Sequence, residues 1–173
     1  MFEDLQIIFY PDPRLRKVSE PVTVFDDRLK LLVAKMFELM RANKGVGLAA
    51  PQVGENIRLF VVNPTGQPED DRIYVNPMLS EPDGPEEEGD EGCLSLPDIS
   101  GKIMRTKTLR MDAQDVEGKP FTDTQSGYLA RIWQHEFDHL NGTLIIDRMG
   151  ALAKIAAKKR LKELEELYSK RKK

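Results

Sequence analysis

The chain has 173 residues, a net charge of −3, one cysteine, two histidines and 40% hydrophobic residues. Its length predicts one domain over residues 1–173 that buries a core without disulfides. The net charge of −3 gives no general case for nucleic-acid binding, and we expect no DNA partner. A single cysteine excludes a disulfide framework and favours a reducing compartment, and no apolar stretch is long enough for a membrane span, so we expect a cytoplasmic protein.

The first quarter of the chain predicts one helix after an irregular start. Pro11 and Pro13 prevent a regular helix near the N-terminus, because proline lacks an N–H and restricts the residue before it. Asp26 or Asp27 can cap a helix that ends at residues 43–45. Its apolar residues recur at helical spacing and are expected in the core: Leu29, Leu32, Val33, Met36 and Met40.

The next segment, residues 45–54, contains the pattern G-x-G-x-x-A of dinucleotide-binding loops. That loop needs a strand before it and a helix after it, whereas here a helix precedes and Pro51 follows, so we reject nucleotide binding. The small residues allow a close approach of backbone to a partner, and Gln52 is the one side chain able to donate a hydrogen bond. The plainer alternative is a structural turn.

Strands are predicted in the middle of the chain, where β-branched and aromatic residues cluster. Residues 57–63, 72–79 and 107–113 read as strands, and a turn at 115–120 leads to a further extended segment at 121–122. Residues 143–146 read as another short strand. The acidic stretch 81–91 reads as a solvated loop.

Both histidines of the chain lie in one predicted helix, residues 134–140, four positions apart. At 3.6 residues per turn this spacing places His135 and His139 on one face, where two imidazoles can bind a metal. The pattern H-E-x-x-H is typical of metallohydrolases, in which the glutamate, here Glu136, is the general base. The alternative is an ordinary amphipathic helix with two surface histidines.

The single cysteine, Cys93, has two possible roles. A lone cysteine is by default a small buried hydrophobe. A catalytic metal site needs three protein ligands and one open position, so Cys93 can also be the third ligand beside the two histidines. The chain would then place its only cysteine and both of its histidines in one site.

Three segments together resemble the signature motifs of the peptide deformylase family, in the family's order, and residues 10–16 resemble its opening. They are Gly45-Val46-Gly47-Leu48-Ala49-Ala50-Pro51-Gln52, Glu91-Gly92-Cys93-Leu94-Ser95 and Gln134-His135-Glu136-Phe137-Asp138-His139-Leu140. The resemblance implies an α+β fold with mixed or antiparallel sheets around a central metal-binding helix, plus an N-terminal and a C-terminal helix. It also implies an enzyme that removes the formyl group from the formylmethionine of new bacterial or organellar polypeptides and releases formate.

The resemblance also implies roles for individual residues. Cys93, His135 and His139 become the ligands of one divalent metal ion, Fe²⁺, with Zn²⁺, Ni²⁺ or Co²⁺ as substitutes. Glu136 becomes the general acid and base, while Gln52 and the backbone N–H of Leu94 become donors to the oxyanion.

The resemblance places five residues near the pocket for the methionine side chain: Val46, Gly47, Tyr128, Arg131 and Ile132. Backbone groups at residues 46–47 would pair with the peptide as an added strand. The sequence departs from the family at Ser100, where some members carry arginine, and Tyr128 and Arg131 are larger or more polar than the aliphatic residues common there. We therefore expect unchanged chemistry and a pocket of different shape.

The predicted C-terminal helix, residues 151–173, is basic, with nine Lys or Arg residues counted from Met149. One interpretation is a solvated face interleaved with glutamates. The other, which the family resemblance implies, is docking on ribosomal RNA through the basic end.

Two other functions share some of these sequence features. A zinc endopeptidase shares H-E-x-x-H but takes a third His or Glu ligand downstream, and this chain has no third histidine. A binding module that keeps the metal only for structure would be expected to lack Gln52 or Glu136, and both are present.

Overall fold

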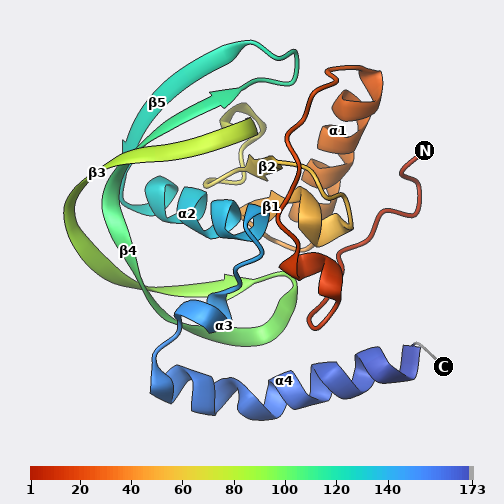
Figure 1. Ribbon diagram of the computed structural model, residues 1–173, viewed down its shortest axis with the longest axis vertical. Helices are drawn as coiled ribbons and strands as arrows, with labels where there is room; N and C mark the ends of the chain where they lie inside the picture. The colour runs from red at the N-terminus through yellow and green to blue at the C-terminus, as the bar shows by residue number, and fades with distance from the viewer. Residues whose placement is uncertain (172–173) are drawn as a thin grey trace.

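The structure is a computed structural model that describes residues 1–171 (Figure 1). It confirms the predicted α+β class: five antiparallel strands form one sheet in the order β1–β2–β3–β4–β5. The strands are β1 (Gly47–Ala49), β2 (Leu59–Val62), β3 (Arg72–Cys93), β4 (Leu96–Gln114) and β5 (Pro120–Ser126). The helices are α1 (Asp27–Ala42), α2 (Tyr128–Leu140), α3 (Ile145–Arg148) and α4 (Ala151–Arg171), with short 3-10 helices η1 (Pro13–Arg16), η2 (Ala50–Val53) and η3 (Pro68–Asp70).

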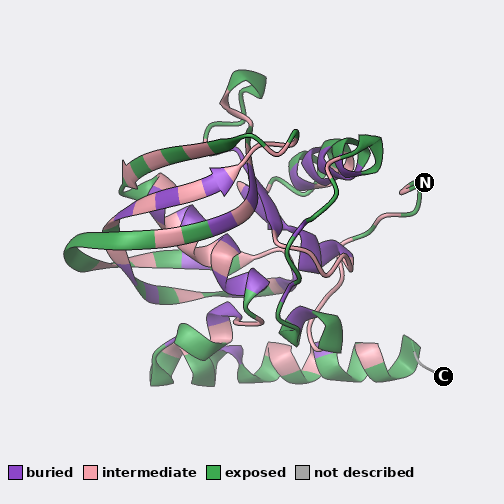
Figure 2. Ribbon diagram, turned by 45° about the horizontal axis from the view of Figure 1, so that its top comes forward, coloured by how far each residue is buried: buried purple, intermediate pink, exposed green. Residues whose placement is uncertain are grey.

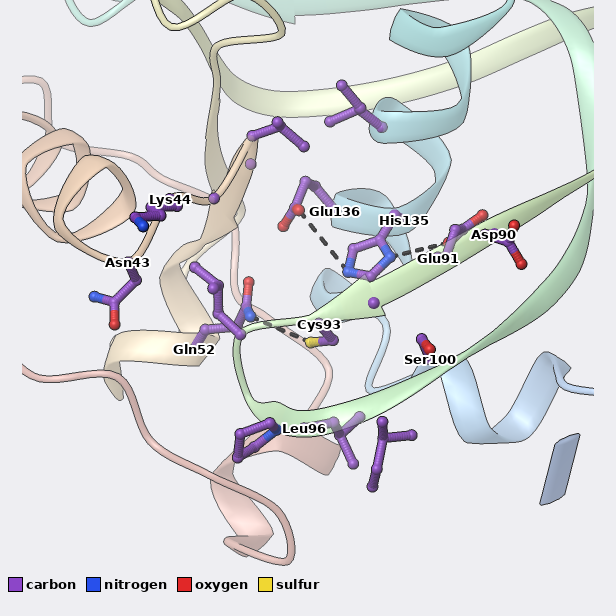
Figure 3. Close-up of a pocket in the computed structure, with 18 of the residues that line it drawn as sticks. Asn43, Lys44, Gln52, Asp90, Glu91, Cys93, Leu96, Ser100, His135 and Glu136 are labelled. Carbon is purple, nitrogen blue, oxygen red and sulfur yellow. Dashed lines mark hydrogen bonds and ion pairs between the residues drawn. The ribbon is translucent and has the colours of Figure 1, made fainter. Parts of the chain in front are cut away.

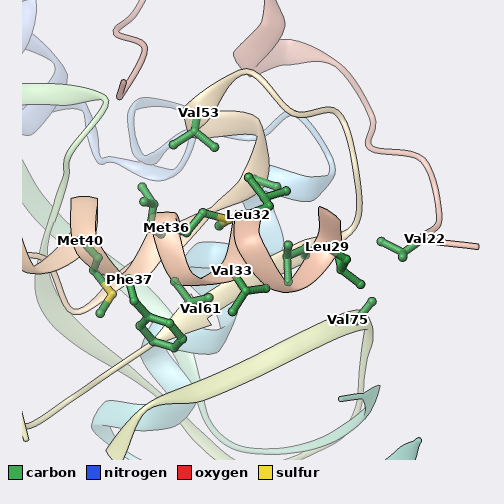
Figure 4. Packing of buried hydrophobic residues seen from close by; sticks show 13 residues of the cluster. Val22, Leu29, Leu32, Val33, Met36, Phe37, Met40, Val53, Val61 and Val75 are labelled. Atoms are coloured by element: carbon green, nitrogen blue, oxygen red, sulfur yellow. The ribbon is translucent and has the colours of Figure 1, made fainter. Parts of the chain in front are cut away.

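Helix α1 forms where the sequence predicts it. The carboxylate of Asp26 accepts the backbone N–H of Leu29 at 3.0 Å, so Asp26, and not Asp27, is the N-cap. The apolar face of the helix packs against β1 and β2, and it shares one buried cluster with Val61 and Val75 (Figure 4). All five apolar residues predicted for the core are buried, as is Phe37.

The prediction of a solvated loop at residues 81–91 is wrong. This segment is the second half of β3 and forms a long antiparallel hairpin with β4. Most of its acidic side chains are exposed, whereas Glu91 is buried. Two of them face basic residues of β4: Glu87 Oε1 lies 3.3 Å from Lys107 Nζ, and Glu88 Oε1 lies 3.3 Å from Lys102 Nζ. Charges of opposite sign on adjacent strands stabilise the pairing, and this cross-strand information is absent from the local composition.

The short strand predicted at residues 143–146 is also wrong, because residues 145–148 form helix α3. The carboxylate of Asp147 accepts the N–H of Leu144 at 2.8 Å and caps the helix, and it also pairs with Arg16. Leu144 and Ile145 are buried against other elements. Tertiary contacts thus override the β-propensity of the isoleucines.

Helix α2 lies on the concave side of the curved strands β3, β4 and β5 (Figure 1). Trp133 is fully buried, and its ring lies 5.7 Å from that of Tyr74. Figure 2 shows that α4, by contrast, is exposed along most of its outer side. The sheet therefore surrounds the helix that carries both histidines.

The C-terminal helix is present from Ala151 to Arg171, which agrees with the prediction over this range. Lys172 and Lys173, the last residues of the predicted helix, lie outside the described residues. The docking of this basic end on ribosomal RNA stays a prediction. Within residues 1–171, none of the helices has the length and apolar character needed to span a membrane.

Candidate active site

A cavity of about 890 Å³ opens between the segment before β1, the turn that joins β3 to β4, and the first half of α2. Four of its lining side chains point toward one another (Figure 3): Gln52, Cys93, His135 and Glu136. These residues come from three elements that are far apart in the sequence, so the cavity exists only in the folded chain.

One thiol and two imidazoles converge at this cavity: Cys93 and His135 line it, and the buried His139 lies next to them. Potential ligand atoms of Cys93, His135 and His139 all lie within 4.8 Å of one another, and Cys93 Sγ lies 3.4 Å from His139 Nε2. In a tetrahedral metal site with metal–ligand bonds of 2.0–2.3 Å, neighbouring ligand atoms lie about 3.5 Å apart. The arrangement therefore has nearly the dimensions that a metal ion requires.

The chemistry of the donor set also suits a cation. Burial and the neighbouring His135 lower the pKa of His139 well below its ordinary value, so this imidazole is neutral, the form that binds a metal. Burial alone would lower the pKa of His135, but Cys93 and Glu91 raise it well above its ordinary value. The negative groups around His135 thus favour a positive charge at this position.

Glu91, the first residue of the cysteine motif and one to which no role was predicted, orients His135. Its Oε1 accepts a hydrogen bond from His135 Nδ1 at 3.0 Å and another from Arg105 at 2.9 Å. This bond selects the tautomer and leaves His135 Nε2 free for a metal. Burial opposes ionisation of Glu91, but Arg105 and His135 lower its pKa to about 2. The sequence holds one indication of this role: Glu91 is two residues before Cys93, a spacing that places both side chains on the same face of an extended strand.

Glu136 lies beside the imidazoles and is 3% exposed. Its Oε1 is 3.9 Å from His135 Nε2, and its Oε2 has no hydrogen-bond partner within residues 1–171. Burial raises the pKa of Glu136 to about 7, helped by the nearby Glu91 and opposed by His135. A carboxyl with this pKa can both accept and donate a proton near neutral pH.

The side-chain amide of Gln52 is held in one orientation. Its Oε1 accepts the N–H of Ala49 at 2.9 Å, which turns Nε2 toward the Oγ of Ser95 at 3.2 Å and the Sγ of Cys93 at 3.5 Å. Leu94, the other residue that the resemblance singled out as a donor, follows Cys93 and lines the same cavity. Two potential donors therefore lie next to the candidate metal ligands.

All five residues that the resemblance placed near the substrate pocket line this cavity: Val46, Gly47, Tyr128, Arg131 and Ile132. Tyr128 is 56% exposed, whereas Ile132 is buried. The guanidinium of Arg131 is already bonded to protein, because it donates to Glu91 at 2.8 Å and to the carbonyls of Glu87 and Ile103 at 2.6 and 2.9 Å. Arg131 thus ties α2 to the β3–β4 hairpin.

Gly47 is in close contact with Glu136, and this contact yields a prediction. A Cβ at position 47 would lie 2.5 Å from Glu136 Oε1, closer than any real Cβ contact. We expect Gly47→Ala to displace the carboxylate and to lower kcat at least about 10-fold, since misplacement by about 1 Å has large catalytic costs. Steady-state assays measure this loss. Gly150→Ala is the control, because nothing lies within 4 Å of its Cβ. Equal kcat for the two variants would contradict the prediction.

Helix α2 carries the pattern H-E-x-x-H, and its two imidazoles lie close to the thiol of Cys93. Burial raises the pKa of the adjacent Glu136 to about 7. Together these features are typical of the class of metal-dependent hydrolases. A protein-family model described as polypeptide deformylase matches residues 4–154. The chain belongs to the peptide deformylase family, enzymes that remove N-formyl groups from nascent peptides.

Relatives and solved structures agree with this assignment. The chain is 42% identical to peptide deformylase of Chromobacterium violaceum, over 93% of this chain and 96% of the relative. It is 41% identical to peptide deformylase 1B, chloroplastic/mitochondrial, of Arabidopsis thaliana, over 95% of this chain but 61% of that longer protein. Peptide deformylase from Plasmodium falciparum superposes with a TM-score of 0.93 at 43% identity, over 95% of this chain and 97% of the other.

Proposed function

We propose that this chain deformylates the N-terminal formylmethionine of nascent polypeptides, with one divalent metal ion held by Cys93, His135 and His139. The observation that carries the proposal is that Cys93, His135 and His139 converge next to Glu136 and the cavity. A bound divalent ion supplies Lewis acidity to the formyl carbonyl and lowers the pKa of water. We propose Fe²⁺, as the family resemblance implies, with Zn²⁺, Ni²⁺ or Co²⁺ as substitutes that imidazole and thiolate ligands also accept.

Glu136 performs the proton transfers in this proposal. Its carboxylate takes a proton from the water that attacks the formyl carbon, and it then delivers that proton to the departing amine nitrogen. Burial raises the pKa of this carboxyl to about 7 without an ion, which opposes the lowering by a bound cation and helps the group to do both in turn. Formate and a free N-terminal amine are the products.

Gln52 and the backbone N–H of Leu94 stabilise the negative charge that develops on the formyl oxygen. Each donor of this kind is worth about 3 kcal/mol when it is aimed at the oxyanion in a site that excludes water. The support for Gln52 is its fixed amide, whose Oε1 is bonded to Ala49 and whose Nε2 faces Cys93.

The peptide binds along β1, with its methionine side chain in the cavity. Within residues 1–171, β1 lies at one edge of the sheet with β2 as its single neighbour, so its other side is available to an added strand at Gly47 and the preceding Val46. Tyr128 and Ile132 of α2 contact the methionine side chain, and Arg131 supports this wall through Glu87 and Ile103. Main-chain pairing of this kind accepts many sequences after the methionine.

We place the activity in a reducing compartment, either a bacterial cytoplasm or an organelle, because Cys93 must remain a thiolate to bind metal. The relatives include bacterial and chloroplast or mitochondrial forms. We propose that residues 1–173 form a single catalytic domain.

The direct test uses protein purified without oxygen and a formyl-Met tripeptide. We expect formate release in amounts equal to the free amine formed, together with about one metal equivalent per chain, as the three ligands predict. Removal of the metal with a chelator should abolish the activity, and Fe²⁺ should restore it more fully than Zn²⁺. Metal binding without release of formate from any formyl peptide would refute the proposal.

A further inference from the structure

One wall of the substrate cavity is held from outside by helix α4. Pro97, Asp98 and Ser100, at the start of β4, line the cavity, and α4 runs beneath this segment in Figure 1. Arg160 of α4 donates from Nε to the carbonyl of Pro97 at 3.1 Å, and its Nη2 pairs with Asp98 at 3.2 Å. A third bond, to Glu163 one turn further along α4, holds the guanidinium at 3.1 Å. One side chain therefore binds both the backbone and a side chain of the wall.

The helix is packed tightly enough for this contact to have a defined geometry. Ala157 and Leu164 of α4 are buried in one cluster with Leu96 and Ile99, which flank Pro97 and Asp98. At Gly101 the strand and the helix are so close that an added Cβ would lie 3.1 Å from the Cβ of Ala153. Movement of α4 would therefore be transmitted to the cavity wall.

The wall segment itself has a backbone conformation that needs support. Asp98 has φ +63°, in the left-handed region that residues other than glycine rarely adopt. Its side chain is 82% exposed, so burial does not hold it in place. Such conformations persist when surrounding contacts determine them, and Arg160 contacts Asp98 and the residue before it.

We propose that Arg160 is a positioning residue for the peptide substrate, because it fixes the Pro97–Asp98 wall from outside the cavity. The proposal rests on the function proposed above. Arg160 touches neither the candidate metal ligands nor Glu136, so its effect should appear in substrate binding and leave the chemical step unchanged. The α4 helix thereby becomes part of the substrate site, although it contributes no lining residue.

The kinetic test compares Arg160→Ala with Lys159→Ala, which removes the same charge from an exposed neighbouring position on α4. We expect Arg160→Ala to raise KM for a formyl-Met tripeptide about 2- to 10-fold, the range for the loss of one or two hydrogen bonds, with kcat within about twofold. Arg160→Lys should give an intermediate KM, because an ammonium can pair with Asp98 but cannot form the same fork to Pro97. Lys159→Ala should match the unchanged protein.

Hydrogen exchange of the same proteins supplies a second measurement that does not depend on activity. We expect faster exchange over residues 97–103 in Arg160→Ala than in Lys159→Ala, with unchanged exchange over 134–140. The positioning role would be overturned if kcat and the melting temperature of Arg160→Ala fell together. It would also be overturned if the KM and the exchange rates of Arg160→Ala equalled those of Lys159→Ala. Absence of formate release by the unchanged protein would overturn the proposed function alone, since the exchange comparison remains valid.

Discussion

Replacing Glu136 by alanine is expected to lower kcat for formate release about 10²- to 10⁴-fold, the range for loss of a general acid and base. Glu136 is the buried carboxyl whose Oε1 lies 3.9 Å from His135 Nε2 and whose Oε2 has no partner within residues 1–171. Cys93 and the imidazoles remain in place, so the bound metal should stay near one equivalent. Formate release and metal content measured on one sample separate the loss of catalysis from the loss of the ion.

Two variants make this result specific. Glu136→Gln keeps the volume of the side chain but cannot accept the proton, so it should be as inactive as the alanine variant. Glu166→Ala removes an exposed carboxylate of α4 and should leave kcat unchanged. Activity of Glu136→Gln near that of the unchanged protein would exclude Glu136 as the base.

The pH dependence follows from the same carboxyl. Glu136 must be ionised to take a proton, so activity falls as the pH drops below its pKa. Burial raises that pKa to about 7 without a cation, and a bound divalent ion lowers it by favouring the carboxylate. The acidic limb of the kcat/KM profile should therefore lie below pH 7, and it should be absent from the residual activity of Glu136→Gln.

Replacing Cys93 by alanine is expected to weaken metal binding more than about 100-fold, because it removes a ligand, whereas loss of an outer partner costs about 10- to 100-fold. Glu91→Gln tests that lower range, because Glu91 accepts from His135 Nδ1 at 3.0 Å and from Arg105 but lies outside the ligand set. Competition with a chelator of known affinity measures both values, and circular dichroism verifies folding.

The matched control for Glu91→Gln is Glu88→Gln on the same strand. Glu88 is exposed and pairs only at the surface, with Lys102 at 3.3 Å, so its loss should leave the metal affinity unchanged. If Cys93→Ala bound the metal as tightly as Glu88→Gln, the thiol would not be a ligand and the metal site would need other residues.

The two wrong secondary-structure predictions have a common cause. Local composition made residues 81–91 a loop and residues 143–146 a strand. In the structure, the first segment is paired along β4 through basic partners such as Lys102 and Lys107, and the second runs into helix α3, which begins at Ile145 and is capped by Asp147. In the first segment, the contacts that fix the secondary structure come from residues remote in the chain. In the second, they come from a side-chain cap. Neither kind of contact enters a prediction from hydrophobic pattern and residue propensity.

Those features of this protein that depend on local geometry can be predicted from its amino-acid order. A helix of 3.6 residues per turn places His135 and His139 on one face, and their ring centroids are 5.2 Å apart. An aspartate at position 26 or 27 predicts the start of α1, where the structure selects Asp26 as the cap. The partners of the two histidines, by contrast, depend on long-range packing. The curvature of β3 and β4 around α2 brings Cys93 and Glu91 to the imidazoles, because residues that distant in sequence approach one another only when the hairpin closes around the helix.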